Sequence, residues 1–418
     1  MSGAHSGVQT RIKHIVPSAK YVHCCSHNLN LVISDAAKCH NKVKHFFETV
    51  QNVFNFFASS APRWALLALG QNFGDKVQKK VLKKVCPTRW EARHDAVFSL
   101  KERFIDVLKA LTCMALTSKK TTERTLASGL KSKIENFEFV LILCTWEPIL
   151  RSLRVISKKL QNVDMNLEEA SKMLNNAFNF IQETRNSYDN NVLDNAKSLC
   201  SRWGIPNKFV EKRESYAKKH FYDNLNGDRR LNTTEENFKV KIFFPVLDTV
   251  LSQLISRFQG MHNVIEDFNF LNPIILSTQT DENIMKASYD FCLTYKDDIN
   301  SDFPRQMLSL KSFIKYEKLN TIKHLGSFIL NNDLSSSFPD VLSACIIFLT
   351  MPITVAGAER SFSKLKLIKN YLRNSCGQER LSSIAILNIE KERTKTLNIE
   401  KIIDNFANAK SRKKNFLK

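Results

Sequence analysis

The sequence predicts a mostly α-helical protein, and three observations lead to this fold class. Glycine and proline number only 11 and 10 among 418 residues, which disfavours sandwiches and barrels built on many tight turns. Apolar residues recur at three- and four-residue intervals over most of the chain, which is the spacing of one helix face. Hydrophobic residues make up 43% of the sequence, so the chain is too apolar to be disordered.

The first 42 residues carry mixed signals. Residues 6–15 fit a short helix, which Pro17 ends. Residues 21–25 read YVHCC, a run of aromatic, β-branched and small apolar side chains that predicts a short strand. Residues 28–39 return to helical spacing. The segment is therefore predicted to combine one strand with two helices.

Residues 43–330 show almost only helical patterns. The runs with the clearest helical spacing are residues 43–57, 141–156, 170–184, 246–258 and 307–316. Proline or glycine breaks the pattern between runs, at Pro62, Pro87, Gly204 and Pro273. Since no fixed repeat length links these units, a regular solenoid is not predicted.

The last part of the chain predicts three helices and a tail. Pro339 suits the first position of a helix that runs to about residue 349. A loop at 351–355 is followed by the remaining predicted elements, which are helices at residues 358–373 and 379–392 and a disordered basic tail at 409–418.

Cysteine usage and the N-terminal residues indicate the cellular compartment of the protein. The 10 cysteines include no Cys-x-x-Cys pair, and residues 1–10 are polar rather than a signal peptide, which predicts reduced thiols in a cytosolic or nuclear protein. Residues 341–358 carry no charge and reach the shortest length of a membrane span. Pro352 and Gly357 interrupt this stretch, so it is interpreted as a buried helix followed by a loop, and no membrane partner is expected.

Lysine and arginine outnumber aspartate and glutamate by 62 to 41, which gives a formal charge of +21 at pH 7. Nucleic acid is the usual partner of such a charge, because neutralising phosphates needs no sequence recognition. The alternative is a basic protein with no such role. Two stretches are candidate phosphate contacts or, alternatively, solvated faces. They are residues 360–418, with 15 basic and 5 acidic side chains, and a basic run that includes Lys83, Lys84, Arg89 and Arg93.

The C-terminal part resembles the signature of hAT transposases. Two stretches carry the resemblance, MPITVAGAERSFSKLKLIKNYLR at residues 351–373 and QERLSSIAILNIE at 378–390. In that family this segment closes an RNase H-like catalytic core and mediates dimerisation. The resemblance therefore implies a homodimer.

Two earlier motifs agree with this resemblance and occur in the expected order. Residues 24–31, CCSHNLNL, are similar to the family's Cys-x-x-His-x-Leu-Asn-Leu motif, with Cys24 and His27 in the named places. Residues 86–93, CPTRWEAR, are similar to the Thr-Arg-Trp motif that opens the family's helical insertion. Within the family, the chain is similar to domesticated sequences of the zinc finger MYM type.

The resemblance implies a mostly α fold, in which a truncated remnant of an RNase H-like α/β core carries a large all-helical insertion. The implied divisions are residues 1–42 for the core remnant, 43–334 for the insertion, 335–408 for the dimerisation segment that closes the core, and 409–418 for the basic tail.

Catalysis in the family uses two aspartates and one glutamate, which hold two divalent metal ions on either side of the scissile phosphate. Glu359 matches the glutamate, and both aspartates are expected to precede Met1 and so to be absent. One carboxylate cannot supply the octahedral oxygen ligands of Mg²⁺. Glu359 is therefore predicted to be a vestigial ligand near a helix start. We expect no catalysis, no small-molecule substrate, no metal and no cofactor, with Mg²⁺ required only if the upstream aspartates are restored.

Other motif residues have a functional and a structural interpretation. Cys24 and His27 are half of a zinc site or, since four ligands are not evident, a buried thiol and a hydrogen-bonded imidazole. The resemblance implies that Trp90 stacks on an unpaired base near the cleavage site, and the alternative is that it packs in the core.

Apolar faces on the two helices of the hAT-like segment predict the dimer interface. The candidate interface residues are Phe362, Leu365, Ile368 and Leu372 on the first helix, and Leu381, Ile384 and Leu387 on the second.

The favoured hypothesis is a non-catalytic, transposase-derived protein of the nucleus that dimerises and associates with DNA. One alternative is the truncated gene model of an active hAT transposase. Another is a helical adaptor whose charge has no nucleic-acid role.

Overall fold

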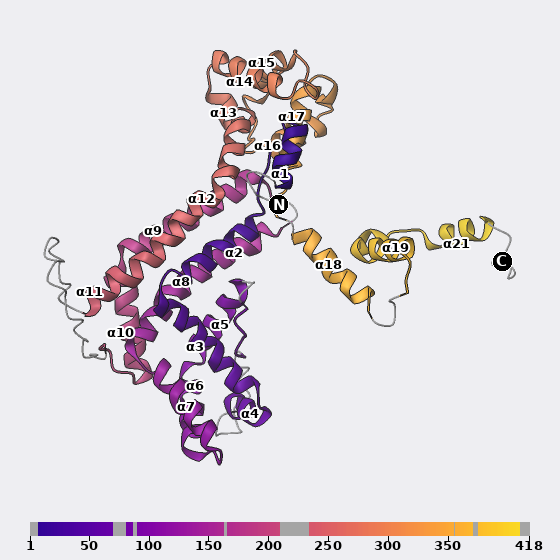
Figure 1. Cartoon of the computed structure of the whole chain (residues 1–418). Helices are drawn as coiled ribbons and strands as arrows, with labels where there is room; N and C mark the ends of the chain where they lie inside the picture. The colour runs from indigo at the N-terminus through magenta and orange to yellow at the C-terminus, as the bar shows by residue number, and fades with distance from the viewer. Residues whose placement is uncertain are drawn as a thin grey trace. The chain divides into compact units, whose positions relative to one another are not determined.

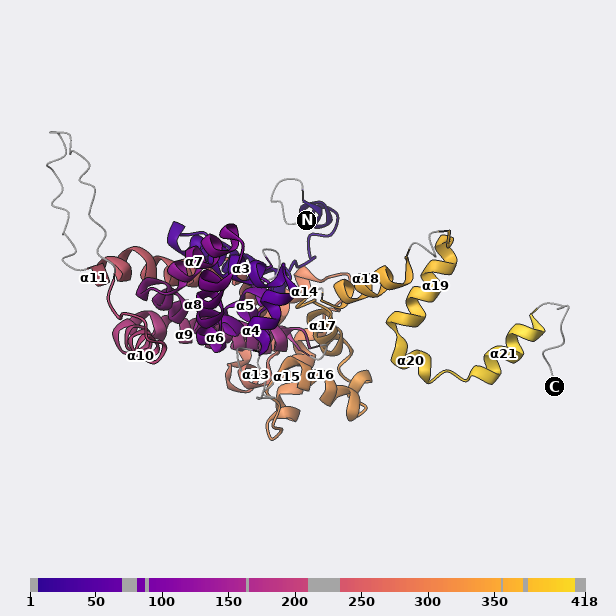
Figure 2. The ribbon, with the colours of Figure 1, turned by 90° about the horizontal axis from the view of Figure 1, so that it is seen from below.

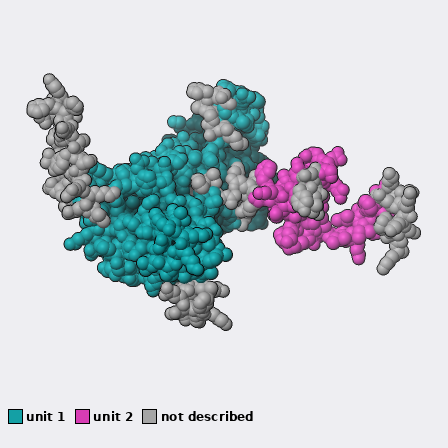
Figure 3. Space-filling model, turned by 60° about the horizontal axis from the view of Figure 1, so that its bottom comes forward, with its two compact units in different colours: residues 1–354 teal, residues 355–418 magenta. Residues whose placement is uncertain are grey.

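The computed structural model of this chain describes residues 7–69, 81–86, 90–162, 165–209, 234–354, 356–370 and 375–409. Over these residues it is a predominantly helical protein without a β-strand, as Figure 1 shows. The chain divides into two compact units, Met1–Thr354 and Val355–Lys418, which Figure 3 colours separately. This division reflects the compactness of each unit and does not test the family-based boundaries. The boundaries at residues 42, 334 and 408 therefore stay predictions.

The described residues of the first unit form a series of helices. They are α1 Val8–Ile15, α2 Cys25–Ala36, α3 Asn41–Ala58, α4 Ala61–Leu69, α5 Trp90–Glu102, α6 Phe104–Thr117, α7 Thr121–Ile134, α8 Phe137–Leu160, α9 Leu167–Asn186, α10 Asp194–Trp203, α11 Thr234–Phe238, α12 Phe244–Phe268, α13 Pro273–Thr278, α14 Asp281–Thr294, α15 Phe303–Ile314, α16 Ile322–Asn331 and α17 Pro339–Leu349. Four short 3₁₀ or π segments join them, at Tyr188–Leu193, Lys239–Phe243, Asn269–Leu271 and Leu334–Ser336.

The core of the first unit is built around the two longest helices, α8 and α12. Most residues of α8 are buried, and its neighbours are α5, α9 and α10. Helix α12 packs against α2 and α9, and Figure 1 shows α9 alongside it, while Figure 2 shows the same ribbon from below. Trp146 of α8 is fully buried, with its ring centroid 5.1 Å from that of Phe47 in α3. The helical runs predicted from apolar spacing are confirmed in α3, α8, α9, α12 and α15.

Side-chain caps fix where several of these helices begin. Asn136 and Asn166 accept hydrogen bonds from the backbone N–H groups of Phe139 and Glu169, at the starts of α8 and α9. Such bonds satisfy donors that have no partner inside the helix. Gly204 ends α10 in the left-handed region at φ 70°, where a Cβ would add strain.

The prediction of a strand at residues 21–25 is wrong. Residues 19–24 form no regular structure, and α2 already begins at Cys25. The Cys25 N–H donates to the Ile353 carbonyl oxygen at 2.9 Å, a single bond rather than a ladder. A strand needs a neighbouring strand to satisfy its backbone groups, and the described residues supply none.

The second unit holds α18 Ala356–Ile368, α19 Gln378–Ile389, α20 Lys391–Lys395 and α21 Ile399–Asn408. Helix α18 begins two residues earlier than predicted, and the helix predicted to continue to residue 392 ends at Ile389 and restarts as α20. The basic tail after Ala409 lies outside the described residues. Among the helices that the structure describes, none combines the length and apolarity needed to span a bilayer.

Candidate dimerisation surface

Helices α18 and α19 pack against each other and form the centre of the second unit. Ile368 and Leu381, at 6% and 8% exposure, are the buried apolar side chains of this pair. The Lys364 ammonium donates to the carbonyl oxygens of Asn388 and Ile389, both at 3.0 Å. These carbonyls end α19, so the lysine lies at the negative end of the helix dipole and holds α18 to α19.

A set of large apolar side chains on the same two helices faces solvent. Phe362 and Leu367 of α18 and Ile386 and Leu387 of α19 are between 50% and 78% exposed. Leu365 and Ile384 are half-buried. Large apolar side chains left exposed on a small unit are candidates for an interaction surface. Leu367 and Ile386 were not among the candidates taken from the sequence, although both belong to the hAT-like stretches.

Four of the predicted site residues fall wholly or in their side chains outside what the structure describes. Glu359 belongs to α18, but its side chain is not described, and the same holds for Trp90 at the start of α5. Arg89 and Leu372 lie in undescribed segments. In the described part of the chain, no three His, Cys, Asp or Glu side chains gather as metal ligands.

The Cys-His motif docks α2 against the rest of the first unit. The Cys24 side chain is half-buried, while His27 is exposed with its ring centroid 5.1 Å from that of His23. The buried residues beside them make the tertiary contacts. Cys25 Sγ lies 3.9 Å from Met261 Sδ, and burial raises the pKa of its thiol to about 12.

Asn28 has a positional role that the sequence did not single out. Its side-chain amide donates to the Arg257 carbonyl oxygen at 2.8 Å, and the Arg257 guanidinium is 2.6 Å from Asp35. These bonds hold α2 on α12. The described members of this motif therefore stabilise the fold.

The Thr-Arg-Trp motif continues into α5 with two anchoring residues. Glu91 accepts a hydrogen bond from Ser157 at 2.8 Å. Arg93 is buried, donates to the Ile33 carbonyl oxygen at 3.2 Å, and places its guanidinium 5.4 Å from the centre of the Phe47 ring. Arg93 is therefore a structural clamp, which corrects its interpretation as a phosphate contact, because a buried guanidinium cannot reach phosphates in solvent.

Lys83 and Lys84 remain available to an anionic partner. Residues 81–85 form no regular secondary structure, with Leu82 and Val85 buried and the two lysines between them exposed. The Lys83 N–H donates to Ser99 Oγ at 3.2 Å, which fixes the segment on α5. Burial of Leu82 and Val85 on either side thus anchors the segment and leaves both lysines exposed.

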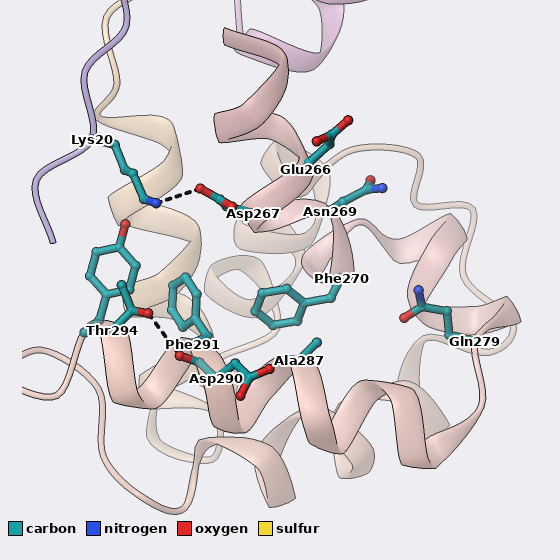
Figure 4. Close-up of a pocket in the computed structure, with 11 residues that line it drawn as sticks. Lys20, Glu266, Asp267, Asn269, Phe270, Gln279, Ala287, Asp290, Phe291 and Thr294 are labelled. Carbon is teal, nitrogen blue, oxygen red and sulfur yellow. Dashed lines mark hydrogen bonds and ion pairs between the residues drawn. The ribbon is translucent and has the colours of Figure 1, made fainter. Parts of the chain in front are cut away.

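One pocket in the first unit, shown in Figure 4, has an acidic lining. It has a volume of about 360 Å³, and Glu266, Asp267 and Asp290 line it with Phe270 and Phe291 among others. The only lysine in the lining, Lys20, is 2.6 Å from Asp267. With three carboxylates against one ammonium, the pocket repels phosphate and is not part of a DNA surface.

Comparison with known families finds a match that includes the C-terminal helices α18 and α19. Residues 311–392 match the hAT family C-terminal dimerisation region. The chain carries a hAT dimerisation region. This region begins in α15 and ends in α20, so it contains every candidate interface residue on α18 and α19.

Two curated proteins are similar over most of this chain. The human 52 kDa repressor of the inhibitor of the protein kinase is 23% identical over 400 residues, which is 91% of this chain and 50% of the repressor. The mouse protein of the same name is 23% identical over 401 residues, 91% of this chain and 51% of its own length. The chain therefore spans about half the length of these relatives. The resemblance to zinc finger MYM-type sequences stays a prediction.

Proposed function

We propose that this chain is a transposase-derived protein whose function is to form a homodimer through its hAT dimerisation region. The observation that carries the proposal is the match over residues 311–392, and the exposed apolar side chains of α18 and α19 support it. Burying such side chains against a second copy removes apolar area from water, at about 25 cal/mol per Å².

Sedimentation equilibrium of the full chain tests this function. We expect a reversible dimer whose fraction rises with concentration in the micromolar range. The proposal would be overturned by a chain that sediments as a monomer at every concentration up to about 100 µM. A dimer that is still dissociated at that concentration is weaker than any physiological dimer of this size.

We propose in addition that the dimer associates with DNA through its basic surface. The formal charge of +21 and the exposed pair Lys83 and Lys84 support this. The variant Lys83→Glu/Lys84→Glu is expected to weaken binding to a 20-base-pair duplex about tenfold near 0.1 M salt and to reduce the salt slope by about 2, because each phosphate contact releases counterions.

The matched control for this experiment is Lys119→Glu/Lys120→Glu, which changes the net charge equally at exposed residues next to α7. Equal losses in both variants would show an effect of net charge alone and contradict a contact at Lys83 and Lys84. Absent or salt-insensitive DNA binding in the unmodified chain would favour the adaptor alternative.

We also propose that these residues do not cleave DNA by themselves. The described residues do not assemble a carboxylate group that fits two divalent metals, and the sequence pattern offers only Glu359. The expected result is no Mg²⁺-dependent nicking of supercoiled plasmid, whether Glu359 is intact or replaced in Glu359→Gln. Nicking that requires both Mg²⁺ and Glu359 would show that this chain is catalytic and contradict the proposal.

The contact between Cys25 and Ile353 supports an RNase H-like arrangement as part of the proposal. It brings the N-terminal motif beside the segment that leads into the hAT-like helices, as closure of a shared core requires. An experimental structure of a longer protein in which residues 19–24 join no sheet would contradict it. A nuclear location fits both the charge and the word repressor in the names of the relatives.

A further inference from the structure

Helix α21 presents an apolar stripe beyond the hAT dimerisation region. Ile399, Ile402, Ile403 and Phe406 occupy one face at intervals of three, one and three residues, and each is between 46% and 66% exposed. None of the ten residues of α21 is buried. Asn398 caps the helix by accepting from the Lys401 N–H at 3.0 Å, so its start is well defined. A capped helix with so clean a stripe is built to pack against another surface.

We infer that α21 pairs antiparallel with α21 of a second copy and so extends the dimer interface. This inference rests on the proposed dimerisation. Continuity supports the choice of partner, because α21 begins seven residues after the matched region ends at residue 392 and belongs to the same compact unit. Ten helical residues span only about 15 Å, so α21 adds to an interface rather than forming one alone.

The stripe is self-complementary. An interface between two identical subunits related by a two-fold axis must pair one patch with itself. Reversing α21 about the midpoint between Ile402 and Ile403 exchanges these two residues and exchanges Ile399 with Phe406. In an antiparallel pair, Ile402 therefore meets the partner's Ile403, and Ile399 meets the partner's Phe406. Each contact occurs twice, which doubles its contribution.

The charges on α21 argue against a membrane surface or DNA as its partner. A membrane-surface helix carries lysine and arginine on its polar face, and a DNA-binding helix needs the same charges. The polar residues of α21 include Glu400 and Asp404 but only one base, Lys401. This helix is locally acidic although the chain has a net charge of +21. Contact between the helix and a surface that carries phosphates is therefore disfavoured.

The test is sedimentation of the full chain carrying Ile402→Asp/Ile403→Asp. The dimer dissociation constant is expected to rise at least tenfold, because charges would be buried in the pair at four positions. The control is Asn408→Asp, which adds a charge on the opposite face of the same helix and should leave the constant within twofold. Far-UV circular dichroism checks that both variants keep their helices.

Photocrosslinking identifies the partner surface. A benzophenone amino acid at residue 402 should give covalent dimers whose crosslinked peptide contains residues 399–406 of the other copy, while the same group at 408 should give few. A wild-type dimer unaffected by Ile402→Asp/Ile403→Asp, or crosslinks that map to α18, α19 or the first unit, would overturn the antiparallel pairing alone. A wild-type chain that never dimerises would instead overturn the proposed function.

Discussion

Replacing Phe362 and Leu387 together with aspartate is expected to convert the dimer into a monomer over the concentrations at which the wild type associates. Both side chains are at least half exposed in the single chain, at 71% and 50%. Burying a large apolar side chain contributes about 1.5–3 kcal/mol, and a buried unpaired carboxylate costs more. A two-fold dimer counts each change twice, so the dissociation constant should rise at least about 100-fold. Sedimentation equilibrium measures it.

The control for this variant is Gln378→Glu/Asn388→Asp, which adds the same number of charges at exposed polar positions of α19. It should dimerise as the wild type does. Ile368→Asp/Leu381→Asp offers a contrast, because these buried side chains hold α18 on α19 and their loss should unfold the second unit. A Phe362→Asp/Leu387→Asp chain that remains a dimer would place the interface elsewhere.

Asp340→Ala is expected to lower the free energy of unfolding of the first unit by about 3 kcal/mol. Asp340 lies in the first turn of α17 and is only 3% exposed. Its carboxylate accepts from the Asn300 backbone N–H at 3.1 Å, the Asn300 side-chain amide at 2.9 Å and the Gln306 amide at 2.6 Å. Removing it leaves three donors without this acceptor, and the one from Gln306 is buried. Urea unfolding followed by circular dichroism measures the loss.

Two further variants sharpen this prediction. Asp340→Asn keeps the shape but turns an acceptor into a donor that faces the donors of Asn300 and Gln306, so it should also destabilise. Asp302→Ala removes an exposed aspartate at the start of α15 and should change the free energy of unfolding by less than about 0.5 kcal/mol. Equal stability of Asp340→Ala and Asp302→Ala would contradict a buried hydrogen-bond centre at α17.

The part of the fold that the sequence predicts correctly is the part that helical periodicity reveals. In α3 the apolar positions recur at three and four residues and are indeed the buried ones, including Val43, Phe46 and Val50. The strand prediction at residues 21–25 failed because a short apolar run says that a segment is partly buried but not whether a neighbouring strand exists. Periodicity also could not place the interruption at Glu390, because residues 390–396 contain no apolar side chain that would mark a helix face.

The candidate site was predictable as a segment but not residue by residue. Phe362 and Ile368 share the apolar face of one helix, yet the first faces solvent and the second is buried. The difference comes from where α19 crosses α18, which is a tertiary contact that no single-helix pattern contains. Arg93 shows the same limit, since its place in a basic run did not reveal the carbonyl of Ile33 that it binds. The spacing of Ile399, Ile402, Ile403 and Phe406 fits one face of a helix and is the sequence signal that indicates α21.

The docking of α2 on α12 has a consequence for synthesis of the chain. Asn28 binds the carbonyl of Arg257, a residue 229 positions later. At a translation rate of about 5–20 residues per second, α2 leaves the ribosome roughly 10–45 s before its partner helix exists. During that interval Leu29, Val32 and Ile33, which are fully buried in the finished protein, lack the surface of α12 that packs on α2. The nascent N-terminal part therefore needs protection from aggregation until α12 has been made.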